Sequence, residues 1–416
     1  MYLLNLDNQA YFYITLIFAV IFGVAYYCRK TSDKPYSFDD ISLYGFGLLE
    51  FVVYAMVGAK FGVSGVIYVT LANILATLLL LMLRLRSSCI RVFTSNNWLS
   101  IVLCLIFCML LVASVGIFAK LSHALVGFKF ANGALAVSLF GIICVLVGGK
   151  RCAIYNARWL LVMSCIVVGV GIAFALQQNG VNLLSNLTDL ANNQGRILQY
   201  YSGIHFNLNA VLGIILSGVF LFVIRYQAIV LVTYSSISRI KIILHSLLPI
   251  ILSAIFAFVG LISIATPNAT SNQGNSVTLQ AQLPDGQTAY IVKSIENSSG
   301  KHINPNPGLL PPILDAQTNL PIAGAYEYAL AANSMLQHYL PKQYVVFAFI
   351  ILMLMLIVSL ANYGLAITRI ISKLLIHYFP ICDSNELARS WTWRVVFVVA
   401  CLIGVIIAFF VPVVHF

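Results

Sequence analysis

Residues Ile41–Gly58 read ISLYGFGLLEFVVYAMVG, an apolar segment that carries one carboxylate, Glu50. A bilayer core about 30 Å thick is crossed by about 20 residues of helix, so this segment is close to the length of a membrane span. A charged side chain in hydrocarbon costs roughly 2.5–3.5 kcal/mol on insertion scales, and residues kept there usually handle an ion, a proton or a substrate. Of the chain's 12 acidic residues, Glu50 is the one inside an apolar segment. Glu50 is therefore the first candidate for a functional residue.

The composition excludes a soluble globular protein. Of the 416 residues, 61% are hydrophobic and 8% are charged, whereas soluble domains carry about 25% charged residues. The pattern predicts an all-α polytopic membrane protein with about ten transmembrane helices. The expected spans are residues 10–28, 41–60, 63–84, 99–119, 126–149, 156–177, 207–225, 241–265, 343–368 and 394–414.

The net charge of +11 indicates the membrane orientation. With the N-terminus outside, most of the 23 basic residues, among them Arg29, Lys30, Lys150 and Arg151, fall on the cytoplasmic side. This distribution obeys the positive-inside rule and predicts that both termini face outward. We expect an integral protein of a bacterial inner membrane. A nucleic-acid partner is excluded, because the charges lie in short loops between spans and form no basic face interleaved with aromatic residues.

The sequence contains no recognisable enzyme motif: no Ser-His-Asp set, phosphate-binding loop or pair of catalytic carboxylates. The nine cysteines lie in expected spans or cytoplasmic loops, so no disulfide framework is predicted. Cys104 and Cys108 lie one helical turn apart, but no histidine or third cysteine is near in sequence, and we expect them to pack and not to bind a metal. We therefore expect a protein that is not an enzyme and has no cofactor, with H⁺ or Na⁺ as a possible coupling ion.

The longest polar segment, residues 267–342, is expected outside the membrane. Within it, Ser276–Ile295 alternates polar and apolar residues around Pro284-Asp285-Gly286. Alternation around such a turn sequence predicts a β-hairpin.

Glu50 belongs to a stripe of small and polar residues. Gly47, Glu50, Tyr54 and Gly58 are spaced by 3, 4 and 4 residues, which places them on one face of a helix. Small residues allow close helix approach or local unwinding, and free carbonyls beside an acidic residue make a cation or proton site. The alternative is a neutral Glu50 that only forms a hydrogen bond to a neighbouring helix.

Other polar residues lie inside expected spans. Asn209 opens the seventh span, which also contains Gly213, and a second glycine-interrupted helix is typical of transporters with inverted repeats. Ser359 and Asn362 share a face of the ninth span, and Asn132 lies in the fifth. Each of these side chains either contacts a ligand or forms interhelical hydrogen bonds.

Three local patterns resemble motifs of one transporter family. They are the paired glycines of Gly148–Asn156, the segment Arg225-Tyr-Gln227, and Val358-Ser359-Leu360 with Asn362. Together they resemble the sodium/solute symporter family, in which the last of these stretches holds sodium. In this chain Val358 precedes a single Ser359, where the family pattern has a small residue and adjacent hydroxyl residues.

The resemblance implies a five-plus-five inverted-repeat transporter core that lacks its last core helix. Residues 1–266 then form a leading helix and core helices one to seven, residues 267–342 an extracytoplasmic loop, and residues 343–416 core helices eight and nine. A partner subunit or a homo-oligomer would complete the bundle within the lipid bilayer.

The sequence therefore predicts a secondary active, symporter-like transporter that moves a small organic solute and is coupled to protons or a cation. Glu50, Ser359 and Asn362 are the predicted ion or proton residues. The predicted substrate-binding residues are Tyr54, Asn132 and Asn209. The alternative is a non-transporting membrane sensor or assembly component that reuses the transporter fold.

Overall fold

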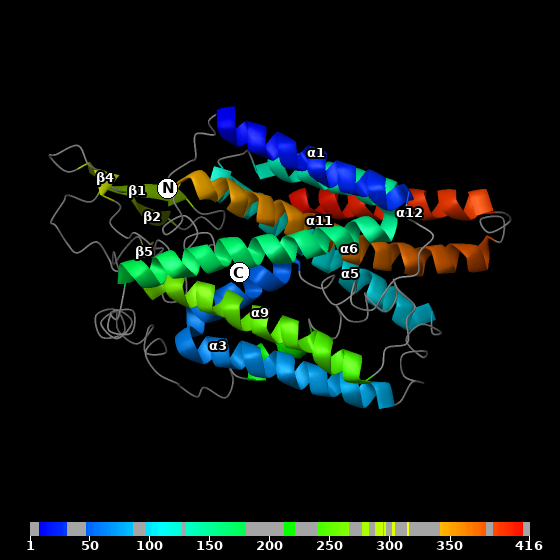
Figure 1. Ribbon diagram of the computed structural model, residues 1–416, viewed down its shortest axis with the longest axis horizontal. Helices are drawn as coiled ribbons and strands as arrows, with labels where there is room; N and C mark the ends of the chain where they lie inside the picture. The colour runs from blue at the N-terminus through cyan, green and yellow to red at the C-terminus, as the bar shows by residue number, and fades with distance from the viewer. Residues whose placement is uncertain are drawn as a thin grey trace.

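The structure is a computed structural model and consists of a bundle of long helices with a group of short strands at one end (Figure 1). The helices are α1 (Asn8–Lys30), α3 (Leu48–Leu85), α5 (Asn97–Val126), α6 (Phe130–Asn179), α9 (Arg239–Ala265), α11 (Lys342–Tyr378) and α12 (Glu386–Phe410). The structure describes residues 8–30, 47–85, 97–126, 130–179, 212–220, 239–265, 277–282, 288–293, 295–296, 302–303, 314–315, 342–379 and 386–410. The bundle is that of an integral membrane protein.

Two of the helices, α3 and α6, reverse direction at a single glycine. Gly62 has φ 60° and ψ −139°, and Gly149 has φ 61° and ψ −154°, a left-handed conformation that glycine adopts without steric cost. In α3 the hydroxyl of Tyr54 reaches the Oδ1 atom of Asn73 at 3.3 Å, although 19 residues of straight helix would span about 28 Å. Each label therefore covers two antiparallel segments. The two segments of each helix match an expected pair of spans. One difference is that residues 150–155, expected between two spans, are helical.

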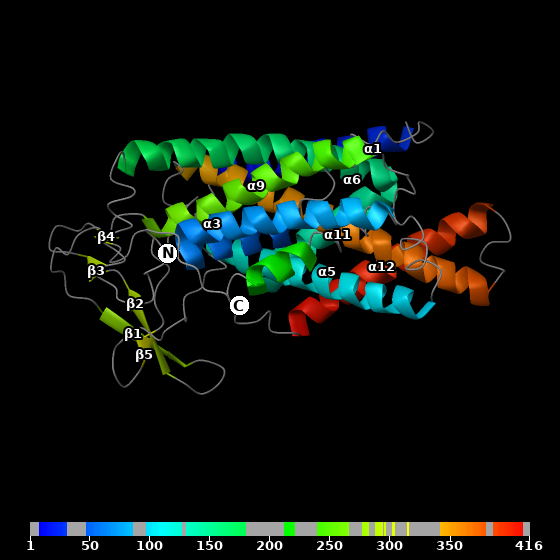
Figure 2. The same cartoon turned by 90° about the horizontal axis from the view of Figure 1, so that it is seen from below.

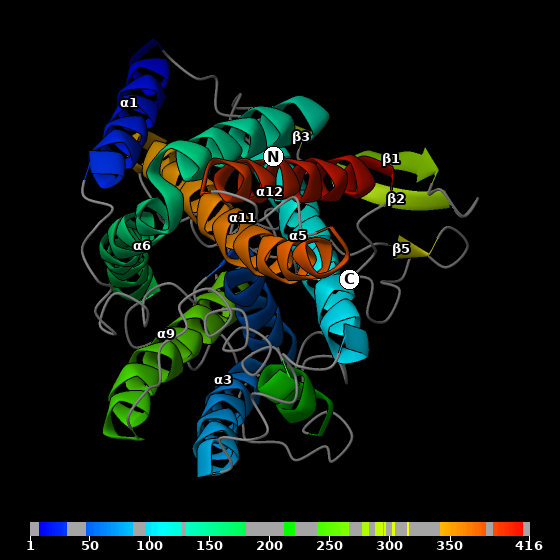
Figure 3. The same cartoon turned by 90° about the vertical axis from the view of Figure 1, so that its right-hand side faces the viewer.

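Helix α11 occupies the centre of the bundle. It packs against α5, α6 and α12, and the end-on view shows it between them (Figure 3). Every residue of α11 from Ala348 to Thr368 is buried. A helix that is apolar on every side is expected in such a buried position.

Helices α3 and α9 lie against each other with their backbones nearly touching. A Cβ atom on Gly58 would overlap the carbonyl oxygen of Ala257, and one on Gly260 would overlap that of Ala55. Figure 2 shows the two helices side by side along the bundle. Small residues at both contacts therefore fix the separation of this pair, as is common between membrane helices.

Length and composition identify four described helical segments as membrane-spanning: Phe61–Leu79, Trp98–Ala119, Val346–Ile376 and Ser390–Phe410. Shorter apolar segments lie in α1, in the first half of α3, in both halves of α6 and in α9. Of the expected seventh span, residues 212–220 are described and helical. Exposed side chains such as Leu78, Met109, Val399 and Ile403 are apolar, as a lipid-facing surface requires.

Three helices extend well beyond the spans predicted from the sequence. Helix α5 continues to Val126, beyond the expected end at residue 119. Helix α11 continues to Tyr378, beyond the expected end at residue 368, and α12 begins at Glu386, before the expected start at residue 394. Hydropathy defines the apolar part of a span, whereas the backbone hydrogen bonds of these two helices continue through the polar turns that contain Arg369 and Trp391.

The predicted β-hairpin is confirmed. Strand β1 (Val277–Gln282) pairs antiparallel with β2 (Thr288–Lys293), with Val277 opposite Lys293. Strand β5 (Leu314–Asp315) adds to the other edge of β2, and β3 (Ile295–Glu296) pairs with β4 (His302–Ile303). The start of α1 lies at the same end of the bundle as the strands, and the ends of α1 and α11 lie at the opposite end (Figure 1).

The contact between α3 and α9 gives a first prediction. Gly58→Ala is expected to lower the midpoint of thermal unfolding by several degrees, because the new methyl group overlaps backbone and the helices must separate, at a cost of about 1–3 kcal/mol. The measurement is thermal unfolding of the purified protein in detergent.

Gly23→Ala is the matched control for this variant. Beyond its own helical turn, no atom lies within 4 Å of the position of its new Cβ atom, so its midpoint should equal that of the wild type or exceed it slightly, because alanine is the better helix former. Equal midpoints for the Gly58→Ala and Gly23→Ala variants would contradict the close contact.

Candidate ion or proton site

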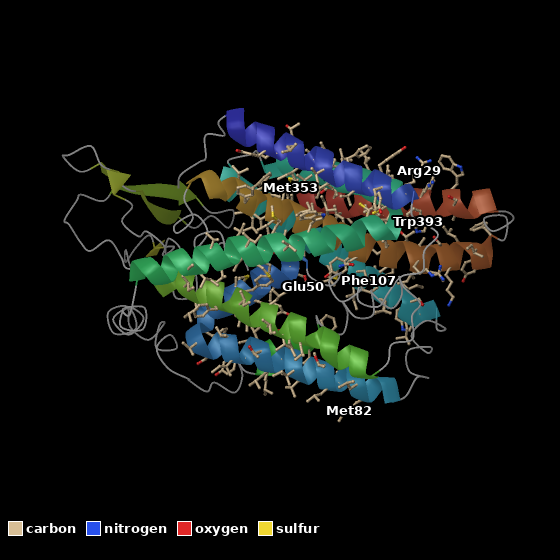
Figure 4. All side chains as sticks on the ribbon, in the orientation of Figure 1. Arg29, Glu50, Met82, Phe107, Met353 and Trp393 are labelled. Atoms are coloured by element: carbon tan, nitrogen blue, oxygen red, sulfur yellow. The ribbon has the colours of Figure 1, made fainter. Side chains whose placement is uncertain are left out.

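The carboxyl group of Glu50 lies at the start of α3, near the middle of the bundle's length (Figure 4). Its side chain is 1% exposed. The Oε2 atom accepts a hydrogen bond from the backbone N–H of Gly47 at 3.1 Å. A glutamate three residues after the helix-capping residue commonly makes this bond, which satisfies one of the N–H groups left over at a helix start.

Two hydrogen bonds connect the start of α3 to the central helix α11. Tyr363 donates its hydroxyl to the Oε1 atom of Glu50 at 3.2 Å. The N–H of Leu48 donates to the Oγ atom of Ser359 at 3.2 Å, and the Ser359 hydroxyl donates to the carbonyl of Met355 at 2.8 Å. Ser359 and Tyr363 are four residues apart, so both face α3 from one side of α11.

Gly47 is the point at which these groups converge. A Cβ atom on Gly47 would lie 2.5 Å from the Oγ atom of Ser359 and 2.9 Å from the Oε2 atom of Glu50. Any larger residue would displace both polar side chains. The missing side chain therefore allows the backbone of α3 to approach α11 closely enough for the hydrogen bonds to form.

Aromatic side chains surround the polar group. Phe51 contacts Phe256 of α9 edge-on, with ring centroids 4.8 Å apart, and Phe107 of α5 stacks on Tyr363 at 6.3 Å. All four rings are almost fully buried. In such an apolar environment hydrogen bonds to a carboxyl group are stronger than in water. Among the described side chains, no lysine, arginine or histidine contacts Glu50.

The structure brings together two of the three predicted ion or proton residues, Glu50 and Ser359, on either side of Gly47. The third, Asn362, lies one turn along α11 from Ser359 and is 3% exposed. Their role as ion or proton residues stays a prediction.

Of the predicted substrate-binding residues, Tyr54 is described in full. It is 2% exposed and donates its hydroxyl to Asn73, in the second half of α3. Asn73 in turn donates to the carbonyl of Val69 at 2.9 Å. Asn132 lies in the first turn of α6, and its side chain is outside the described residues, as is all of Asn209.

Two residues of these networks were not among the predicted site residues. Tyr363 follows Ser359 by four residues, and this helical spacing was the signal available in the sequence. Asn73 is an amide within the apolar third span. A polar side chain there also requires a partner or a function, although its cost is smaller than that of a carboxylate.

The sequence matches no protein-family model and no curated protein sequence. Among solved structures, the fold is similar to that of a Na⁺-coupled sialic acid symporter in a substrate-bound, outward-open state. The TM-score is 0.62 at 11% sequence identity, and the match covers 99% of this chain and 84% of the symporter chain. The expectation of a helical membrane transporter fold is therefore confirmed, and membership of the sodium/solute symporter family stays a prediction.

The hydrogen bonds of Glu50 predict different stabilities for two variants. Glu50→Gln keeps a carbonyl oxygen for the N–H of Gly47 and an amide that can donate to the Tyr363 oxygen, so its unfolding midpoint should stay near that of the wild type. Glu50→Ala removes both of these hydrogen bonds, which should lower the free energy of unfolding by about 1–3 kcal/mol for each. Thermal unfolding in detergent compares the two, and equal midpoints would show that these bonds contribute nothing to stability.

Ser359 gives a second comparison. Ser359→Ala removes the acceptor of the Leu48 N–H and should destabilise the protein by about 1–3 kcal/mol. Ser138 is an equally buried serine whose Oγ atom has no hydrogen-bond partner in the described part of the chain. Ser138→Ala should therefore leave the unfolding midpoint unchanged or raise it. A larger loss for the Ser138 variant than for the Ser359 variant would contradict the assigned bonds.

Proposed function

We propose that this protein is a secondary active, symporter-like transporter that moves a small organic solute across the membrane, coupled to protons or a cation. The single observation that carries the proposal is the buried Glu50 carboxyl group at the start of α3, bonded to α11. A carboxyl group in this position is costly unless it has a task, and ion or proton handling is the usual one. The transporter fold supports the same conclusion.

The geometry explains how an ion could control the helices. Glu50 belongs to α3, whereas Tyr363 and Ser359 belong to α11, so a change in the charge of the carboxyl group changes the strength of the connection between two helices. A ligand shifts a conformational equilibrium only through such a difference in interaction energy between states. Binding and release of the coupling ion at Glu50 are therefore coupled to a rearrangement of α3 against α11.

The remaining assignments belong to the same proposal. Ser359 and Asn362 complete the ion region, and Tyr54, Asn132 and Asn209 contact the solute. The segment 267–342 forms an extracytoplasmic loop between the two parts of the core, and a partner subunit or second copy completes the bundle. The protein resides in a bacterial inner membrane with both termini outside, an orientation supported by the distribution of its basic residues.

The test uses the full-length protein reconstituted in liposomes on a solid-supported membrane. Currents are recorded during proton and sodium concentration jumps, in the presence of amino acids, sugars or carboxylates as solutes. A solute-dependent current is expected in the wild type and should vanish in Glu50→Gln while the protein remains folded, because glutamine cannot change its charge.

Ser138→Ala is the matched control, since Ser138 lies outside the proposed site, and its current should equal that of the wild type. An undiminished current in Glu50→Gln would contradict the role of Glu50. The absence of any solute-dependent current from folded protein over the whole panel would contradict transport and favour a sensor or assembly component.

A further inference from the structure

We infer that the ion bound by Glu50 is a proton and not sodium, and that Tyr363 is the positioning residue that accommodates both states of the carboxyl group. The inference rests on the proposed function and specifies which ion is transported with the solute. It is carried by the direction of the hydrogen bonds around Glu50.

The two carboxyl oxygens of Glu50 and the hydroxyl oxygen of Ser359 each receive a hydrogen bond from the protein. Oε2 of Glu50 accepts from Gly47, Oε1 accepts from Tyr363, and Oγ of Ser359 accepts from Leu48. A hard cation is held by a shell of about six oxygen atoms that direct lone pairs at it. Here three N–H or O–H groups are directed at the oxygens and compete with a metal cation for their lone pairs, whereas one added proton needs only a single lone pair.

The polarity of α3 points the same way. Glu50 lies in the first turn of α3, where the unpaired N–H groups carry a partial positive charge. In transporters, helix N-termini are directed at negatively charged groups, whereas cations are held by free carbonyls and helix C-termini. A proton that adds to the carboxylate makes a neutral group and places no positive charge at this helix end.

The Tyr363 hydroxyl can form a hydrogen bond with either protonation state of the Glu50 carboxyl group without rearrangement of the backbone. When Glu50 is ionised, the Tyr363 hydroxyl donates to Oε1, the bond that the structure shows at 3.2 Å. When a proton from water adds to Oε1, the new carboxylic O–H can donate to the Tyr363 oxygen, because a phenol is both donor and acceptor. Protonation therefore reverses one hydrogen bond, and release of the proton to water restores it.

The elements packed against α3 add few other titratable groups. Helix α11 contributes Tyr363, and the described side chains of α9 between Ile250 and Ile262 are all non-titratable. Helix α5 contributes Cys104 and Cys108, which interact with each other, and Cys108 also interacts with Cys401 of α12. Within the described side chains of α3, α5, α9 and α11, Glu50 is the one carboxyl group.

The test is infrared difference spectroscopy of the purified full-length protein during pH titration. A protonated carboxyl group gives a C=O stretching band that a carboxylate lacks. We expect such a band to appear as the pH falls, to be absent in Glu50→Gln, and to be the same in sodium chloride and choline chloride.

Tyr363→Phe tests the positioning role. The band should remain but move to higher frequency, because the carboxylic group loses a hydrogen-bond partner. Tyr54→Phe is the matched control: it removes the hydroxyl of an equally buried tyrosine that bonds to Asn73 and not to Glu50, so the band should keep its position. An unmoved band in Tyr363→Phe would overturn the role of Tyr363, and this variant gives a result even if Glu50→Gln does not fold.

Two results would overturn the proton assignment: no pH-dependent band that depends on Glu50, or a carboxylate band that sodium shifts in the wild type and not in Glu50→Gln. This failure is distinct from failure of the proposed function. A sodium-driven, Glu50-dependent solute current would leave the transporter proposal intact while the proton assignment fails.

Discussion

The hydrogen bonds of the Glu50 carboxyl group are the interaction on which the centre of this structure depends. One oxygen accepts from the first turn of α3, and the other accepts from Tyr363 on α11. The remaining features of the site follow from this pair of bonds. Gly47 must lack a side chain so that the backbone approaches Ser359, and aromatic rings must surround the group so that water does not compete for its donors.

Under the proposed function, the same carboxyl group has two roles that make opposite demands. As part of the helix start it contributes to stability through bonds that should stay intact. As a coupling group it must gain and lose an ion, which weakens and restores those bonds. The hydroxyl of Tyr363 reconciles the demands, because it can donate or accept without movement of either helix. Bistable connections of this kind are what conformational switching requires.

The sequence predicted the parts of the fold that depend on local patterns. The β-hairpin of residues 277–293, the reversal at Gly149 and the burial of Glu50 were all visible as alternation, paired glycines or an isolated charge. The connection between Glu50 and Tyr363 joins residues 313 positions apart. No local pattern specifies which two distant helices meet, so the contact of Tyr363 with Glu50 could be recognised only in the folded chain. For the same reason the partner of Tyr54 was not foreseen.

The fold is similar to that of a Na⁺-coupled sialic acid symporter at 11% sequence identity. The contacts at the glycines and around α11 indicate which constraints are sufficient to maintain this fold. Three features constrain residue size and polarity more than residue identity: the reversals at Gly62 and Gly149, the close contacts at Gly58 and Gly260, and a buried, mostly apolar central helix. Residues that are free of these constraints can change while the fold is kept.

The most direct test of the connection between α3 and α11 is a double-mutant cycle on the free energy of unfolding, measured by titration with denaturing detergent. Glu50→Ala, Tyr363→Phe and the double variant are compared with the wild type. The account predicts that Tyr363→Phe costs much less when Glu50 is already alanine, with a coupling energy of about 0.5–3 kcal/mol. Additive free energies would show that the two side chains do not interact, and would contradict the account.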